Sequence, residues 1–417
     1  MLHLHQRIRL AGIVDLNSQP GNHDPGSTGH QPAQDAEKTG VDAVRAARYE
    51  KIKLRLTIAV LFLSFALPLA LLFTDGSEVL RDFSQDISSI PAITVLVYVL
   101  IVALGFEVIT FPVDFYGGYV VEKRFGLARE TLREWAWDWA KSQALQLAFM
   151  IPAVELIYYL LRTMPGTWWI VAGAVFTAFF VLLSALAPVL LFRLFFKFEP
   201  LPDGELKDRL LQLSARLNVR VRGVYIWKLG EKTSKANAAL AGWGRTRRIL
   251  LADTLLEEHT IDEIEVVLAH EMAHQVHHDI WKGLVIQTVL VFVSLYAVHM
   301  ALTAWSDAFG FTSISDIANL PLLLVVTAVV ALVALPIANG LSRKMEHAAD
   351  VYALEKTGMA TAFASAMERL ARQNLSQQRP NRLVEIIFHS HPAVQSRIEF
   401  ARQWEQAQAG IRRGIQQ

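Results

Sequence analysis

Cysteine is absent from this chain of 417 residues. Its absence excludes disulfide bonds, thiolate metal ligands and a cysteine nucleophile, so any bound metal ion must be held by histidine, aspartate or glutamate. Charge is also scarce, because only 19% of the residues are Asp, Glu, Lys or Arg and the net charge at pH 7 is +1. A balance so close to zero does not suggest a nucleic-acid partner, and we expect none.

Apolar residues are in excess, at 53% of the chain, and the mean hydropathy is +0.31. This composition is typical of a membrane protein, so we expect the lipid bilayer to be one of its partners. A helix needs about 20 residues to cross the hydrocarbon core. Stretches of roughly that length occur at 56–73, 92–111, 144–161, 168–192, 284–304 and 320–338. The sequence therefore predicts a mostly α, polytopic membrane protein with about six transmembrane helices.

Lys and Arg are distributed unevenly between the two sets of connecting segments. The segments 74–91, 162–167 and 305–319 contain only two basic residues, Arg81 and Arg162. The other segments carry basic clusters, and Lys and Arg accumulate on the cytoplasmic side of short loops. We therefore expect both termini to be cytoplasmic.

Polar composition divides the chain into parts. Residues 1–52 begin rich in Gly, Pro, Ser and Gln and predict a disordered cytoplasmic tail. Residues 53–197 hold transmembrane helices 1–4, with a cytoplasmic loop at 114–143, and residues 282–340 hold helices 5 and 6. The polar parts 198–281 and 341–417 are separated by only one hairpin of spans. They are expected to assemble into one cytoplasmic α+β domain.

The first polar part contains the motif HExxH in the segment VVLAHEMAHQV. In a helix, His270 and His274 lie one turn apart on one face, so both imidazoles can reach one cation. A catalytic zinc site has three protein ligands and a fourth position for water or substrate. Glu271 is then placed to take a proton from that water and return it to the leaving amine. The motif alone leaves open a polar surface patch without a metal.

The segment SRKMEHAAD, which follows the last span, is the obvious source of a third ligand. Glu346 and Asp350 lie four residues apart, hence on one helical face, so one can ligate while the other orients a ligand. Asp350 is placed to accept a hydrogen bond from the second nitrogen of a ligating histidine. In isolation the two acids could equally be solvated. The histidines that compete as ligands, and that rank lower by their helical positions, are His277, His278 and His347.

Six segments together resemble the type I CAAX prenyl protease family, a group of integral-membrane zinc metallopeptidases of the gluzincin class. The segments are FPVDFYGGYVVEKRFGLARETL, FKFEPLPDGELK, NAALAGWGRTRRILLADTLLEE, HEMAH, RKMEHAADVYAL and HSHPAVQSRIEF. The segments look bacterial, so the expected location is the inner membrane of a bacterial cell. The resemblance implies a zincin-like catalytic domain that holds one Zn²⁺ per chain.

The resemblance also implies roles for individual residues at the metal. His270, His274 and Glu346 correspond to the zinc ligands, and Glu271 corresponds to the general base. Asp350 corresponds to the acid of the family's ExxxD pattern, which orients a ligand without binding the metal itself.

Further roles are implied around the metal. His391 is similar to the histidine that helps hold the scissile carbonyl oxygen, although a structural histidine before a proline-started helix is the alternative. Arg397 resembles the arginine that pairs with the motif's carboxylates. Asn237 and Ala238 resemble the edge-strand residues that bind an extended peptide substrate.

The resemblance predicts an integral-membrane zinc metalloendopeptidase. Its expected substrates are peptides or proteins that are prenylated or embedded in the membrane, and its expected role is CAAX-protease-like processing or membrane quality control. The eukaryotic members have seven spans around an intramembrane chamber, whereas we count six here. A transporter or channel is a competing hypothesis, since Glu107 and Glu155 lie within apolar stretches and the metal would then be structural. An inactive scaffold is a third, against which the intact motif argues.

Overall fold

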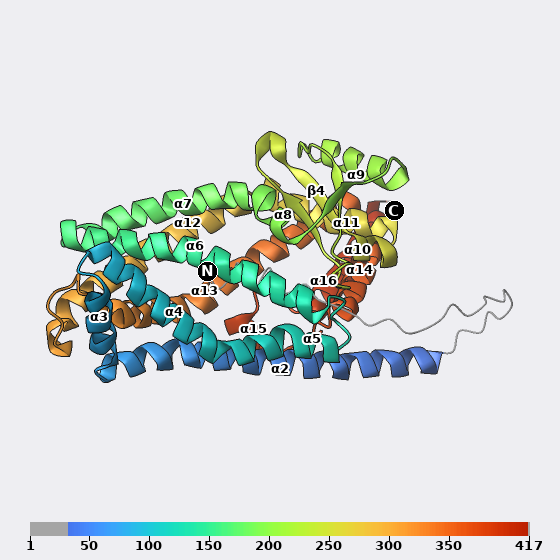
Figure 1. Ribbon diagram of the computed structural model, residues 1–417. Helices are drawn as coiled ribbons and strands as arrows, with labels where there is room; N and C mark the ends of the chain where they lie inside the picture. The colour runs from blue at the N-terminus through green and yellow to red at the C-terminus, as the bar shows by residue number, and fades with distance from the viewer. Residues whose placement is uncertain (1–31, 416–417) are drawn as a thin grey trace.

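The computed structural model describes residues 32–415, which form a long bundle of helices with a small sheet at one end (Figure 1). Among these residues, six helices are long and apolar enough to cross a membrane, and each contains most or all of one predicted stretch. These candidate spans are Asp42–Phe73, Pro91–Arg124, Leu132–Thr163, Trp168–Ala187, Asp279–Trp305 and Ile317–Thr357. The predicted fold class is confirmed.

The membrane region is built from long helices joined by short connections. Its helices are α2 (Pro32–Phe73), α3 (Gly76–Ile87), α4 (Pro91–Phe115), α5 (Val121–Arg124), α6 (Leu132–Thr163), α7 (Trp168–Leu190), α8 (Phe192–Phe195), α12 (Asp279–Trp305) and α13 (Leu320–Thr357). A single π-helical turn at Tyr116–Val120 joins α4 to α5. At the end far from the sheet, Arg81 of α3 forms an ion pair at 2.9 Å with Asp316, in the connection between α12 and α13.

Two predictions about polar segments are wrong in part. Helix α2 begins at Pro32, so residues 32–52 are helical rather than disordered, while 1–31 lie outside the described residues. Within this extension, Ala46 and Tyr49 lie one turn apart in an apolar cluster that also contains Phe125. That contact stabilises the helix beyond the apolar stretch. The loop predicted at 114–143 is mostly helical as well, because only residues 125–131 lie between α5 and α6.

The small sheet has four short strands in the order β1-β2-β4-β3. These strands are β1 (Phe198–Pro200), β2 (Val224–Trp227), β3 (Ala238–Ala241) and β4 (Arg248–Ala252). Strands β2 and β4 are parallel, and β1 and β3 flank them in antiparallel pairing. Strand β3 is therefore an edge of the sheet, with only its β4 side paired among the described strands.

One apolar core joins the two polar parts of the chain. The helices around the sheet are α9 (Glu205–Arg216), α10 (Asp253–Glu258), α11 (Ile261–Val276), α14 (Ala360–Gln373), α15 (Arg382–Phe388) and α16 (Val394–Ile415). The core contains Leu251 and Leu268 from the first part and Phe363 and Ile398 from the second, all nearly inaccessible to solvent. The two parts therefore form one domain, although two membrane spans separate them in sequence.

Helix α13 runs without interruption from the apolar span into that domain. It ends at Thr357, where Gly358 adopts a positive φ of 68° that a residue with a side chain rarely takes. The boundary predicted at residue 340 therefore lies inside a continuous helix. Glu346 therefore lies on the same helix as the last candidate span.

Candidate metal centre

Helix α11 carries both histidines of the HExxH motif. Its start is fixed by a capping box, in which Thr260 Oγ1 accepts a hydrogen bond from the Glu263 backbone N–H and Glu263 Oε2 accepts one from that of Thr260. The rings of His270 and His274 lie with their centroids 5.0 Å apart. The spacing of four residues therefore places both imidazoles on one face, as the helical pattern predicts.

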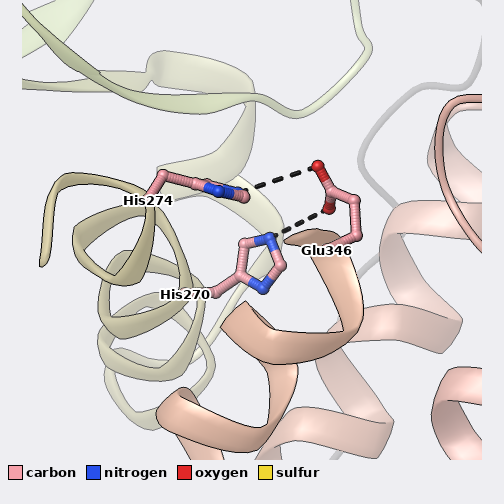
Figure 2. A group of neighbouring side chains, drawn as sticks. All are labelled: His270, His274 and Glu346. Atoms are coloured by element: carbon pink, nitrogen blue, oxygen red, sulfur yellow. Dashed lines mark ion pairs between the residues drawn. The ribbon is translucent and has the colours of Figure 1, made fainter. Parts of the chain in front are cut away.

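Helix α13 brings Glu346 against this pair (Figure 2). Its Oε2 lies 3.3 Å from His270 Nε2, and its Oε1 lies 3.7 Å from His274 Nε2. One ligand atom from each of the three residues lies within 4.8 Å of the others, which is close enough for all three to hold one ion. Glu346 Oε2 is buried and accepts no hydrogen bond from residues 32–415. A cation between the three side chains would satisfy it.

Each histidine is oriented by a carboxylate on its other ring nitrogen. Asp350 Oδ1 lies 2.9 Å from His270 Nδ1, and Asp279 Oδ2 lies 2.9 Å from His274 Nδ1. When Nδ1 carries a proton and donates it in a hydrogen bond to the carboxylate, the lone pair of Nε2 is free for a metal ion. Both Nε2 atoms face Glu346 (Figure 2). The donor set therefore fits a resident metal ion.

Arg397, on α16, binds the carboxylate that orients His270. It donates to both oxygens of Asp350, through Nε at 2.8 Å and Nη2 at 2.5 Å. Burial lowers the pKa of Arg397, but the charge of Asp350 and, more weakly, those of Glu346 and Glu271 raise it by more. The guanidinium thus stays charged and compensates the carboxylates gathered around the histidines.

His270 holds a proton strongly when no metal is bound. Burial lowers its pKa, but the neighbouring carboxylates of Asp350 and Glu346 outweigh burial and raise the pKa to about 9. The same two carboxylates that favour a protonated imidazole also favour a metal cation at Nε2. A metal ion must therefore displace a proton from this ring at neutral pH.

Two family models match the chain, one over each part of the architecture. Residues 200–405 match the model for peptidase family M48. Residues 33–197 match the model for the CAAX prenyl protease N-terminal region, described as five membrane helices. The chain belongs to peptidase family M48.

Individual proteins agree with this M48 assignment. The uncharacterized metalloprotease YhfN of Bacillus subtilis is 28% identical over 366 residues, which cover 87% of this chain and 86% of the relative. A probable CAAX prenyl protease 1 of Schizosaccharomyces pombe is 26% identical over 295 residues, covering 70% of this chain and 62% of that protein. The crystal structure of S. mikatae Ste24p shares the fold, with a TM-score of 0.77 at 21% identity over 86% of this chain and 89% of that chain.

Membership of M48, together with six candidate spans and the three converging ligand groups, makes this chain an integral-membrane metallopeptidase. The predicted enzyme class is therefore confirmed. The transporter hypothesis rested on acids within apolar stretches. One of them, Glu107 of α4, accepts a hydrogen bond from Gln143 of α6 at 3.1 Å, as an interhelical structural contact does.

In this M48 site the structure places His391 beside the carboxylate of Glu346. His391 lies in the connection between α15 and α16, and its Nε2 is 3.2 Å from Glu346 Oε1. Its side chain is 55% exposed, so the ring contacts Glu346 and also reaches solvent. Glu271 is half-buried on α11, directly after His270.

The predicted substrate residues lie at the edge of the sheet. Asn237 is exposed and precedes β3, and its backbone carbonyl accepts a hydrogen bond from Ala252 at 2.9 Å. Ala238 begins β3 and pairs with Leu251 of β4. Strand β3 also packs beside α11, the helix that carries the histidines.

The histidines that ranked lower as ligands have other contacts. His347 packs against Phe400, with ring centroids 4.7 Å apart, and His277 packs against Tyr352 at 5.3 Å. Sequence reasoning missed Asp279, the partner of His274. The backbone at His278 is left-handed, with φ of 58°, and this reversal returns Asp279 to the histidine five residues before it. The rule that ligating histidines pair with carboxylates was the one available signal.

Proposed function

We propose that this protein is a zinc endopeptidase that hydrolyses peptide bonds in membrane-associated or lipidated peptides and proteins. The observation that carries the proposal is the convergence of His270, His274 and Glu346, with a carboxylate behind each histidine. Two imidazole nitrogens and one carboxylate oxygen are the ligand set of catalytic zinc sites that keep a position open for substrate or water. A bound zinc ion would act there as a Lewis acid, polarising the scissile carbonyl and acidifying the attacking water.

Side chains of the protein carry out the proton transfers, contact the scissile carbonyl and orient the histidines. Glu271 accepts the proton of the attacking water and later delivers it to the leaving nitrogen. His391 donates to the oxygen of the carbonyl as negative charge develops on it, a contribution that grows in the transition state. Asp350 and Asp279 keep the two histidines in one tautomer, and Arg397 fixes Asp350.

The substrate binds as an extended strand along β3. An unpaired edge offers main-chain donors and acceptors, so affinity comes from the backbone and does not depend on one sequence. Asn237, exposed at the start of that edge, adds a side-chain amide. Several relatives are CAAX prenyl proteases by name, which supports lipidated C-terminal peptides as one substrate class.

Peptide cleavage by detergent-purified protein tests the proposal. One panel should contain an unstructured peptide, its prenylated form and its acylated form, each with and without a zinc chelator. We expect cleavage that stops on chelation and returns with about one zinc per chain. Cleavage of none of these peptides by zinc-loaded protein, or cleavage that persists after the metal is removed, would contradict the proposal.

We further propose that the metal centre and both termini face the cytoplasm of a bacterial cell. The support is the scarcity of Lys and Arg in the connections at the end of the bundle opposite the sheet. Because the chain has no cysteine, the single variants Ser89→Cys and Ala409→Cys report on the two ends directly. A membrane-impermeant thiol reagent applied to whole cells should label only Ser89→Cys. Labelling of Ala409→Cys alone would show that the chain has the opposite orientation in the membrane and would contradict the proposal.

A further inference from the structure

Helix α15 precedes the connection that carries His391. The burial of apolar side chains does not hold this helix in place. None of its side chains is buried. Leu383 and Ile386, two of its apolar residues, are 68% and 38% exposed. Burial of an apolar face is what normally fixes a helix on its neighbours. The position of α15 therefore depends on other contacts.

Two side chains of α13 hold the carboxyl end of α15. The last carbonyl groups of a helix have no partner inside the helix and need outside donors. Arg343 Nη1 donates to the carbonyl oxygens of Glu385 at 2.9 Å and His389 at 2.5 Å, with Ile386 further away at 3.4 Å. Asn339, buried four residues earlier on the same helix, donates through Nδ2 to the carbonyl oxygen of Ile387 at 2.6 Å.

This clamp fixes one end of the short connection in which His391 lies, and Glu385 of α15 fixes the other. Arg343 binds its first residue, His389, and Glu385 Oε1 accepts a hydrogen bond from the backbone of Ala393 at 3.0 Å. His391 lies between these points with its side chain 55% exposed, so packing alone does not set its orientation. Its Nε2 nevertheless lies 3.2 Å from Glu346 Oε1. Glu346 follows Arg343 by three residues on α13, so one helix supplies both the ligand and the clamp.

We propose that Arg343 is a positioning residue, supported by Asn339, that holds His391 in register with the metal ligand Glu346. The proposal rests on the role of His391 proposed above. Because Arg343 donates to backbone carbonyl groups on either side of the His391 connection's start, it acts on the reaction through the position of the histidine. A displacement of about 1 Å in a group that contacts the transition state can lower the rate by roughly 100-fold.

A double-mutant cycle in the zinc-loaded, full-length protein tests this role. His391→Ala should lower kcat by about 100-fold to 1,000-fold. Arg343→Ala should lower kcat by roughly 10-fold to 100-fold, with KM and zinc content unchanged. The double variant should match His391→Ala within about twofold, because the clamp has nothing left to position. Lys344→Ala, which changes the exposed neighbour on the same helix, should keep the wild-type rate.

Several outcomes would overturn the proposal. If the two single losses multiply in the double variant, Arg343 acts independently of His391. If Arg343→Ala loses zinc, or cleaves at the wild-type rate while His391→Ala does not, the clamp has no positioning role. If His391→Ala itself keeps the wild-type rate, the proposed role of the histidine fails, and the clamp proposal fails with it.

Conservative variants keep the test usable if Arg343→Ala does not fold. Arg343→Lys keeps the charge but lacks the planar fork that spans several carbonyls. Asn339→Ala removes one hydrogen bond of the clamp. Both should lower kcat in the same direction by a smaller factor and leave zinc content unchanged. Wild-type kcat in both would overturn the proposal.

Discussion

Asp279 provides a specific test of how the metal centre is built. Its Oδ2 lies 2.9 Å from His274 Nδ1, and its side chain is buried, so no water readily replaces it. Asp279→Asn keeps the size of the side chain and one acceptor oxygen but removes the negative charge that strengthens His274 as a ligand. Loss of such a supporting carboxylate typically weakens metal binding by about 10-fold to 100-fold, or roughly 1.4 to 2.7 kcal/mol.

The assay is zinc affinity, measured by competition with a chelator of known affinity on the purified protein. Lys282→Ala is the matched control, because Lys282 binds the other oxygen of Asp279 at 2.8 Å and is 53% exposed. Removing this exposed lysine should change the affinity by less than about threefold. An affinity for Asp279→Asn within twofold of wild type, or an equal loss in Lys282→Ala, would refute the reasoning.

Three further predictions concern the same site. Asp350→Ala should destabilise the protein by about 3 to 5 kcal/mol, because it leaves the charge of Arg397 buried without its partner; an unchanged unfolding midpoint in detergent would contradict this. Zinc affinity should rise by about tenfold per pH unit up to pH about 9, because the metal displaces the proton of His270, whose pKa without metal is about 9. Titrations between pH 6 and 8 that give one constant affinity would be inconsistent with this competition. Asn237→Ala should raise KM by up to about tenfold with little change in kcat, since a hydrogen bond to an extended substrate contributes to binding; steady-state kinetics that show a lower kcat at constant KM would place Asn237 in the chemical step instead.

Local patterns were enough to predict the spans and the pairs of side chains that share a helical face. Hydropathy is a property of each stretch by itself, so the six candidate spans follow from composition. Helical spacing alone places His270 and His274 on one face, and the same spacing on α13 puts Glu346 and Asp350 together. The length of α2 was not predicted, because its extension is stabilised by contact with Phe125, which is remote in sequence.

The supporting contacts could not be predicted from local patterns. The position of Asp279 depends on a left-handed backbone at His278, a conformation that only a few per cent of residues other than glycine adopt. The grip of Arg343 on α15 joins residues more than forty positions apart, and its acceptors are carbonyl groups that every residue possesses. Strands β1 and β3 contain only three and four residues, too few for an alternating pattern to be recognised.

Metal content and peptide cleavage, measured side by side for the wild-type protein and Glu271→Gln, test the central claim most directly. Glu271→Gln preserves the shape of the side chain and leaves the three metal-binding groups untouched, but it cannot accept a proton. We predict about one zinc per chain in both proteins and a loss of cleavage in the variant of about 100-fold to 10,000-fold. A variant that retains zinc and cleaves at the wild-type rate would show that Glu271 is not the base, and the proposed mechanism would be wrong.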